Sequence, residues 1–117
     1  MAHDEELASR MRNSLDGLPG LSERRMMGGI CFMLDGNMIG GAHRERTGEG
    51  KLLFRVGKAQ QEAALALPGT VPMVNGGRRM GGFVHAGEAV DDATMRELVS
   101  MALAFVTTLP PKPGRER

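Results

Sequence analysis

The N-terminal part of the chain repeats its apolar residues at a spacing typical of an amphipathic helix. Leu7, Met11 and Leu15 recur every four residues, so a helix over residues 4–16 carries them along one side. Acidic residues gather at its start, where the helix dipole favours negative charge, and Gly17 follows its end. We predict a first helix here, packed against the rest of the protein through its apolar side.

The C-terminal part shows the same kind of pattern over a longer stretch. Apolar side chains lie at helical spacing between Met95 and Val106. Asp91 or Asp92 offers a side-chain cap for the first turn, and Pro110 cannot continue a helix. A helix bounded in this way is about 27 Å long, which is enough to cross a small sheet.

Between these two helices the pattern is typical of short strands joined by tight turns. Residues 23–27 and 30–34 are separated by glycines, and Asp35-Gly36 is a dipeptide favoured in type I′ hairpin turns. We therefore predict a hairpin at this turn. It sets the cross-strand neighbours that we expect, which are Met33 with Met38, Phe32 with Ile39, and Cys31 with Gly40.

The remaining segments complete a two-layer α+β domain. Residues 51–56 alternate like a strand, residues 58–67 are rich in good helix formers, and residues 72–75 and 80–86 suit a second hairpin. The predicted order is helix, about three strands, helix, about two strands, helix. Short connections make the sheet of about five strands antiparallel, with the helices on one face. We expect one domain over residues 1–110 and a mobile tail over 111–117.

Composition narrows the possible functions. The 117 residues carry 15 Lys plus Arg against 14 Asp plus Glu, and they include four Phe but no Trp or Tyr. Neither the net charge of +1 nor the scarcity of aromatic rings favours bulk binding to nucleic acid. The chain has one cysteine, no apolar run of about 20 residues, and an acidic start unlike a signal peptide. We expect a cytoplasmic protein without a membrane span.

Several blocks of the sequence together resemble the TfoX N-terminal domain (TfoX/Sxy) family. They are MAHDEELASRMR, LPGLSERRMMGGICFMLDGNM, EAALALPGTVPM, GRRMGGFVHA and ALAFVTTLPPKP, and they run almost end to end. Met27 stands where the family commonly has Phe, which keeps an apolar side chain there.

This resemblance implies a small α+β fold like that of secretion chaperones, and a link to the regulation of natural competence in some bacteria. Longer members that regulate competence carry a further C-terminal domain. We expect this chain to be a stand-alone domain of the N-terminal type. The resemblance supplies no catalytic residues.

Cys31 is the one candidate nucleophile, and its surroundings argue against that role. A reactive thiol needs a lowered pKa and some exposure, whereas Cys31 lies between Ile30 and Phe32 in an apolar run. The single cysteine and three scattered histidines show no metal-ligand spacing. We predict no catalytic residues, no metal and no cofactor.

Two arginine pairs are candidates for an anion-binding or partner-binding patch. Arg24 and Arg25 precede the first hairpin, and Arg78 and Arg79 lie in the GGRRMGG stretch. That stretch lacks the spacing of phosphate-binding glycine loops. The four guanidinium groups form one patch only if their strands lie side by side, and the ordinary alternative is that each is solvated.

The segment before Asp35 is apolar on both of its alternating faces, whereas helices cover only one face of a two-layer domain. We therefore predict an interface on the other face, made by Met27, Cys31, Met33 and Met38. The alternative is that the short second helix or a loop covers it.

From these features we expect a non-enzymatic regulatory or protein-interaction module that forms a homodimer and binds an unknown protein partner. The second hypothesis is a nucleic-acid-linked transcriptional or competence regulator that uses the arginine patch. A small enzyme that uses Cys31 is the third.

Overall fold

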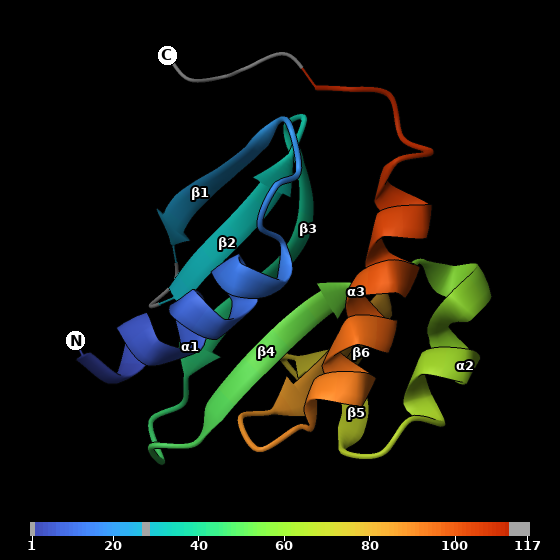
Figure 1. The fold of residues 1–117 in the computed structure, drawn as a ribbon. Coiled ribbons are helices and arrows are strands. Elements are labelled where there is room, and N and C mark those ends of the chain that lie inside the picture. The colour runs from blue at the N-terminus through green and yellow to red at the C-terminus, as the bar shows by residue number, and fades with distance from the viewer. Residues whose placement is uncertain (1, 27–28, 113–117) are drawn as a thin grey trace.

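A computed structural model of the chain describes residues 2–26 and 29–112, and these form one antiparallel sheet with helices packed on one face (Figure 1). The six strands lie in the order β1-β2-β3-β4-β6-β5. In chain order the elements are α1 (Ala2–Ser14), β1 (Leu21–Met26), β2 (Gly29–Leu34), β3 (Asn37–Arg44), β4 (Gly50–Arg55), the 3-10 helix η1 (Lys58–Gln60), α2 (Gln61–Leu65), β5 (Thr70–Asn75), β6 (Arg78–Gly87) and α3 (Asp92–Val106).

The hydrophobic core lies on the side of the sheet that the helices cover. Phe32, Phe54 and Val84 are fully buried and belong to one row of cross-strand neighbours, in which Gly40 of β3 lies between the two phenylalanines. Apolar residues of all three helices join the same core cluster. Each such aromatic or aliphatic side chain contributes roughly 1.5–3 kcal/mol when it is removed from water. The predicted α+β two-layer class is confirmed.

Helix α1 packs against β3 and β4 at positions where these strands carry glycine. A Cβ atom added to Gly40 would lie 2.4 Å from the Met11 Cε atom and 2.5 Å from the Leu53 carbonyl oxygen. A Cβ atom on Gly50 would lie 2.7 Å from a Leu7 methyl carbon. The apolar stripe of α1 therefore contacts the sheet backbone itself, and the glycines set how closely the helix approaches.

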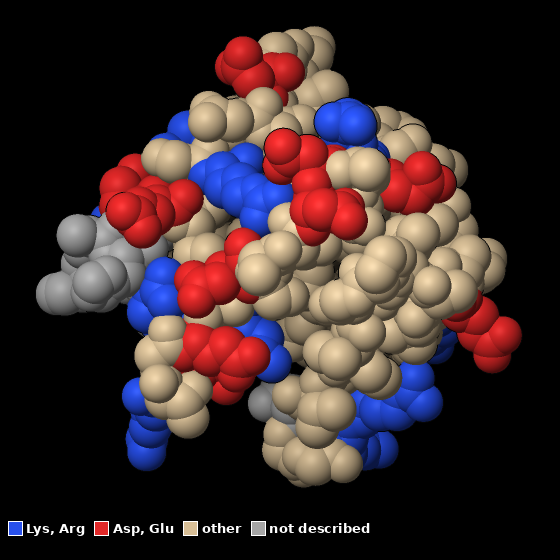
Figure 2. All heavy atoms as spheres, turned by 60° about the horizontal axis from the view of Figure 1, so that its bottom comes forward, with Lys and Arg blue, Asp and Glu red and all other residues tan. Residues whose placement is uncertain are grey.

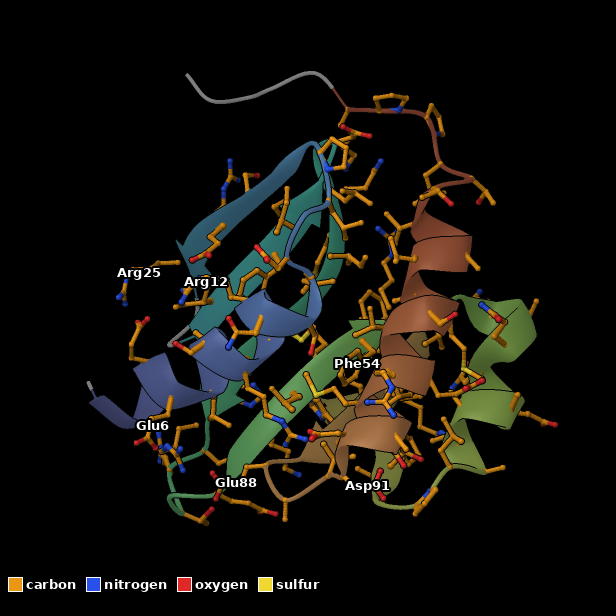
Figure 3. The ribbon with its side chains drawn as sticks, in the orientation of Figure 1. Glu6, Arg12, Arg25, Phe54, Glu88 and Asp91 are labelled. Carbon is orange, nitrogen blue, oxygen red and sulfur yellow. The ribbon has the colours of Figure 1, made fainter. Side chains whose placement is uncertain are left out.

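Two arginines of α1 tie the helix to its neighbours, one to strand β1 and the other to the start of α3. Arg12 donates to both carboxylate oxygens of Glu23 on β1, with its Nε atom 2.5 Å and its Nη2 atom 2.9 Å from them (Figure 3). This guanidinium holds the pKa of the Glu23 carboxyl below its usual range. Arg10 donates to the carbonyl oxygen of Val90 and to a carboxylate oxygen of Asp92, at 2.5 and 3.1 Å. The C-terminal half of α1 is thus held on two sides by charged groups.

Helix α3 begins where the sequence offers two possible caps. The Asp91 carboxylate accepts a hydrogen bond of 2.7 Å from the Thr94 backbone N–H, so Asp91 is the N-cap and Asp92 is the first helical residue. This bond, together with a second one to Thr94, lowers the pKa of Asp91. The helix ends at Val106, four residues before Pro110.

The strand count differs from the expected number. The structure has four strands before α2 rather than about three, and six in all rather than about five. The helix expected over residues 58–67 is also shorter, because residues 58–60 form η1 and α2 ends at Leu65. Beyond it, the Thr70 hydroxyl donates to the carbonyl oxygens of Ala64 and Leu67 and so caps the turn that leads into β5.

The hairpin at Asp35-Gly36 forms as predicted, but part of its expected register is wrong. Both turn residues have positive φ, 52° and 83°, and Met33 does pair with Met38. A bulge then shifts the pairing, so that Phe32 lies opposite Gly40 and Cys31 lies opposite Gly41. Because of this shift Gly40, rather than Ile39, lies beneath Met11, and the helix has room to approach.

The chain beyond α3 returns to the first hairpin turn. The Lys112 backbone N–H donates to the Asp35 carbonyl oxygen at 2.9 Å, and the Asn37 side chain donates to the Pro110 carbonyl oxygen at 3.0 Å. Residues 110–112 are therefore tied to the turn. The rest of the predicted tail, residues 113–117, lies outside the described residues, and its mobility stays a prediction. No helix in the described ranges is long and apolar enough to cross a membrane.

The glycine contact beneath α1 predicts a large difference between two substitutions that add the same methyl group. Gly40→Ala forces its new Cβ against the Leu53 carbonyl oxygen, and we expect a loss of about 1–3 kcal/mol in the free energy of unfolding. Gly87→Ala is the control, because a Cβ there meets no atom within 4 Å. Urea unfolding measures both variants. Equal costs for the two would show that α1 does not approach the sheet in this way.

Candidate functional site

The sheet face opposite the helices, which we call the open face, contains one row of cross-strand neighbours that crosses all six strands. Directly opposed residues of antiparallel strands share a face, and successive residues alternate between faces. The members of this row therefore lie on the side away from the core. In spatial order from β1 to β5 they are Arg24, Cys31, Gly41, Leu53, His85 and Val71.

The centre of the open face is apolar and its surroundings are basic. Leu53 is only 8% exposed although it is outside the core cluster, so neighbouring side chains on this face cover it. At the β5 edge of the row Val71 is 45% exposed. Arg24 lies at the β1 end, and Lys51 lies two residues before Leu53 on the same face of β4. The face thus offers a contact surface with an apolar middle and charged margins.

Three of the four residues predicted for an interface lie on the open face. Cys31 belongs to the six-strand row, and Met33 and Met38 face each other across β2 and β3. All three are half-buried rather than fully exposed. The fourth, Met27, lies outside the described residues. Because α2 packs against β5, β6 and the core on the helix side, it does not cover these side chains.

Two histidines lie beside one another on the open face. The rings of His43 and His85 are 5.5 Å apart between centroids and tilted by 55°, and His43 Nε2 lies 3.1 Å from a carboxylate oxygen of Glu45. The Nε2 atom of His85 is buried and has no hydrogen-bond partner in the described part of the chain. Burial, aided by the positive charges of His43 and Lys51, lowers the pKa of His85 to about 4.

The environment of Cys31 keeps its thiol protonated. Burial raises the pKa of this thiol, and the positive charge of Arg24 acts in the opposite direction without reversing the shift. A nucleophilic cysteine needs a pKa shifted the other way. Within residues 2–26 and 29–112, no three His, Cys, Asp or Glu side chains gather in a way that could hold a metal ion.

The two arginine pairs lie toward opposite edges of the sheet. Arg24 and Arg25 are on β1, whereas Arg78 and Arg79 are on β6, and the strands β2, β3 and β4 lie between them. Strands are about 4.8 Å apart, so this separation is on the order of 19 Å. The four arginines could form a single patch only if their strands were neighbours, and the strands β1 and β6 are not.

At the end of the molecule where the β3–β4 and β6–α3 loops lie, the charges of the described residues are of both signs (Figure 2). In Figure 2, acidic and basic side chains are interspersed over this end. Arg25 extends from the β1 edge away from the other strands (Figure 3).

Leu53, His85 and Val71 are members of the open face that the sequence did not indicate. Alternation along residues 51–56 and 83–86 shows that Leu53 and His85 point away from Leu52, Phe54 and Val84. Nothing in the sequence, however, shows that β4 pairs with β6, or that β6 lies between β4 and the edge strand β5. The row across six strands becomes visible only with the strand order.

The lowered pKa of His85 predicts a fall in stability on mild acidification. Because the unfolded chain takes up a proton near pH 6.5 and the folded chain only near pH 4, stability is full above pH 6.5 and is lost as the pH falls between these values. We expect the free energy of unfolding to fall by about 1–2 kcal/mol between pH 7 and pH 5.

Urea unfolding at the two pH values, with His85→Gln and His43→Gln, tests this expectation. The first variant removes the titrating group, so most of the pH dependence disappears. His43→Gln keeps most of the pH dependence, because burial of His85 is the main cause of its lowered pKa. If His85→Gln retains the full dependence, another group is responsible.

A family model for the TfoX N-terminal domain matches residues 13–106, which is most of the chain and runs from α1 to the end of α3. No curated protein and no solved structure matches the chain. The chain belongs to the TfoX N-terminal domain family.

Proposed function

We propose that this protein is a non-enzymatic regulatory module that acts through protein contacts on its open face, as a homodimer that also binds a protein partner. Its family membership supports a regulatory role of the kind linked to competence. The helix layer supplies the stability of the fold, and the open face supplies the contact surface.

The observation that carries this proposal is the row of side chains across the six strands. The apolar centre at Cys31 and Leu53, with Met33 and Met38 beside it, has charged residues at its margins. Protein interfaces have this anatomy, in which an apolar centre excludes water and a polar margin fixes orientation. A twofold axis through the face brings the same side chains of two copies together.

The other two hypotheses receive less support from the geometry. A nucleic-acid binder needs a continuous basic surface to follow a phosphate backbone, and the strand order separates the two arginine pairs. An enzyme based on Cys31 needs a lowered thiol pKa, whereas burial raises it. Contact with protein therefore remains the proposal that the site favours.

A charge placed on the open face tests the dimer. We expect Met33→Lys to weaken self-association at least tenfold, or about 1.4 kcal/mol, because it buries an ammonium group between two copies. Ala104→Lys adds the same side chain to an exposed position of α3 and is the matched control. Light scattering over a range of concentrations measures the mass of each variant.

The expected result is a dimer for the wild type and for Ala104→Lys, and a monomer at equal concentration for Met33→Lys. A monomer mass for the wild type at every concentration contradicts the proposal. So does a dimer that Met33→Lys leaves intact and Ala104→Lys disrupts.

A further inference from the structure

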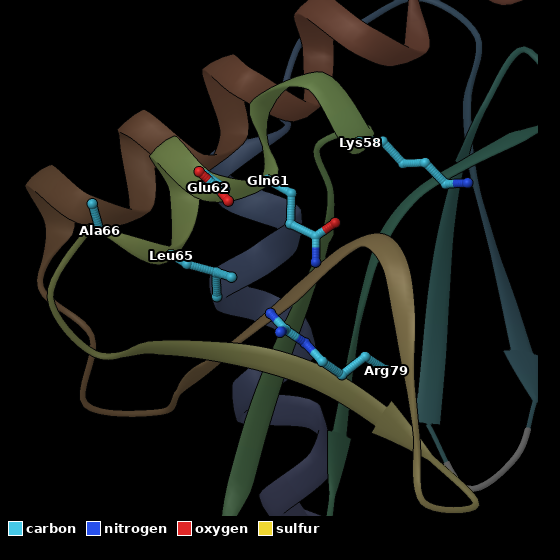
Figure 4. Close-up of a pocket in the computed structure, with 6 residues that line it drawn as sticks. All are labelled: Lys58, Gln61, Glu62, Leu65, Ala66 and Arg79. Carbon is cyan, nitrogen blue, oxygen red and sulfur yellow. The ribbon is translucent and has the colours of Figure 1, made fainter.

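A concave site, separate from the open face, lies on the helix side of the protein between α2 and the β5–β6 hairpin. This depression of about 600 Å³, which we call the α2 cleft, opens to solvent (Figure 4). It is lined by Lys58, Gln61, Glu62, Leu65, Ala66 and Arg79. None of these residues belongs to the open face.

The backbone of β6 holds one wall of the α2 cleft in position. The Gly82 N–H donates to the Gln61 side-chain oxygen at 2.8 Å, and the Gly82 carbonyl oxygen accepts from the backbone N–H groups of Val56 and Gly57 at 2.9 and 3.0 Å. Gly82 has a φ of 86°, a conformation that favours glycine. The Gln61 side chain is thus fixed through its oxygen, and its NH2 group remains available as a donor.

Arg79 and Gln61 direct hydrogen-bond donors into the same space. Figure 4 shows the Arg79 guanidinium and the Gln61 amide group pointing toward one another across the cleft, while Lys58 extends away from them. Neither the guanidinium nor the amide nitrogen has a hydrogen-bond or ion-pair partner within residues 2–26 and 29–112. Two groups that only donate, placed around one space, suit a carboxylate, which only accepts.

Part of the remaining surface beside these donors is aliphatic. Leu65 and Ala66 form part of the cleft wall, and Val74, which is 54% exposed, lies directly opposite Arg79 on the neighbouring strand. Glu62 also lines the cleft, and its negative charge disfavours a ligand with many negative charges, whether a nucleic-acid backbone or a run of acidic residues. The charges and the apolar wall therefore complement a single carboxylate flanked by aliphatic side chains.

The neighbouring sheet edge does not offer the alternative of adding a strand. β5 is the edge strand, but Pro72 lacks an N–H and the pairing with β6 is irregular between Pro72 and Val74. An extended peptide finds no continuous ladder of backbone groups there. Recognition at this end of the sheet thus depends on side chains in the cleft.

We infer that the α2 cleft binds an acidic, aliphatic segment of a partner protein, with one Asp or Glu carboxylate held by Arg79 and Gln61 and its aliphatic neighbours against Leu65 and Val74. The site is separate from the open face, so it binds a segment of this kind whether or not the protein is a dimer.

Titration with short capped peptides tests the cleft. The probe is a short peptide that carries one Glu between leucines, and its control is the same peptide with Gln in place of that Glu. We expect the Glu peptide to bind at least about tenfold more tightly, because only a carboxylate makes charge-assisted bonds with the guanidinium. Backbone amide shifts in NMR spectra of the labelled wild-type protein should change in residues 58–66 and 74–82.

Three variants identify the donors. Arg79→Gln removes the guanidinium, and Gln61→Glu keeps the oxygen that Gly82 contacts while replacing the NH2 donor with a repelling oxygen. We expect each of these two variants to bind the Glu peptide about tenfold more weakly than the wild type does. Arg78→Gln is the matched control, since Arg78 is exposed but is not in the cleft lining, and it should change affinity by less than about twofold.

Several results would overturn the inference. These are equal affinity for the two peptides, no binding of the Glu peptide at millimolar concentration, shift changes confined to other residues, or an equal loss with Arg78→Gln. Displacement of the peptide by a DNA duplex in a manner that depends on Arg79 would identify the occupant as a phosphate backbone instead. Monomer formation in the open-face variants leaves this test unaffected, so the two proposals fail separately.

Discussion

The fold depends on the close contact of α1 with the backbone of the central strands. Gly40 and Gly50 leave room for Met11 and Leu7, and the bulge in the first hairpin is what places Gly40 beneath the helix. Helix α3 lies on the same side of the sheet as α1, and Arg10 links the two helices through hydrogen bonds to Val90 and Asp92. The helices then occupy one face of the sheet, and the apolar core is confined to that side.

This one-sided arrangement explains why chemically different side chains lie on the two faces. On the helix side, Phe32 and Phe54 are completely buried, whereas on the other side Cys31 and Met33 are half-buried and cations lie around them. Half-burial by neighbours on the same face is typical of a surface that a second protein can complete. The open face and the α2 cleft lie on opposite sides of the sheet, so the two proposed contacts do not overlap.

The sequence predicts the two long helices and the turn of the first hairpin well, because these depend on local signals. The spacing of Leu7, Met11 and Leu15 and the turn chemistry of Asp35-Gly36 are complete within a few residues. The bulge that pairs Phe32 with Gly40 is not visible in this way, because the turn dipeptide sets only the pairing nearest to it, that of Met33 with Met38. Strand order is non-local in the same way, and it is what separates the arginine pairs and assembles the row from Arg24 to Val71.

The central proposal is that two copies of the protein meet through the open face, and intermolecular contacts measured by NMR test it most directly. A mixture of protomers with labelled methionine methyl groups and unlabelled protomers reports only contacts between copies. If two copies meet through the open face, we expect intermolecular signals at Met33 and Met38. We expect none at Met11 or Met95, which are buried in the core. Intermolecular signals confined to residues of the helix layer, or their complete absence at concentrations where the mass is that of a dimer, would contradict it.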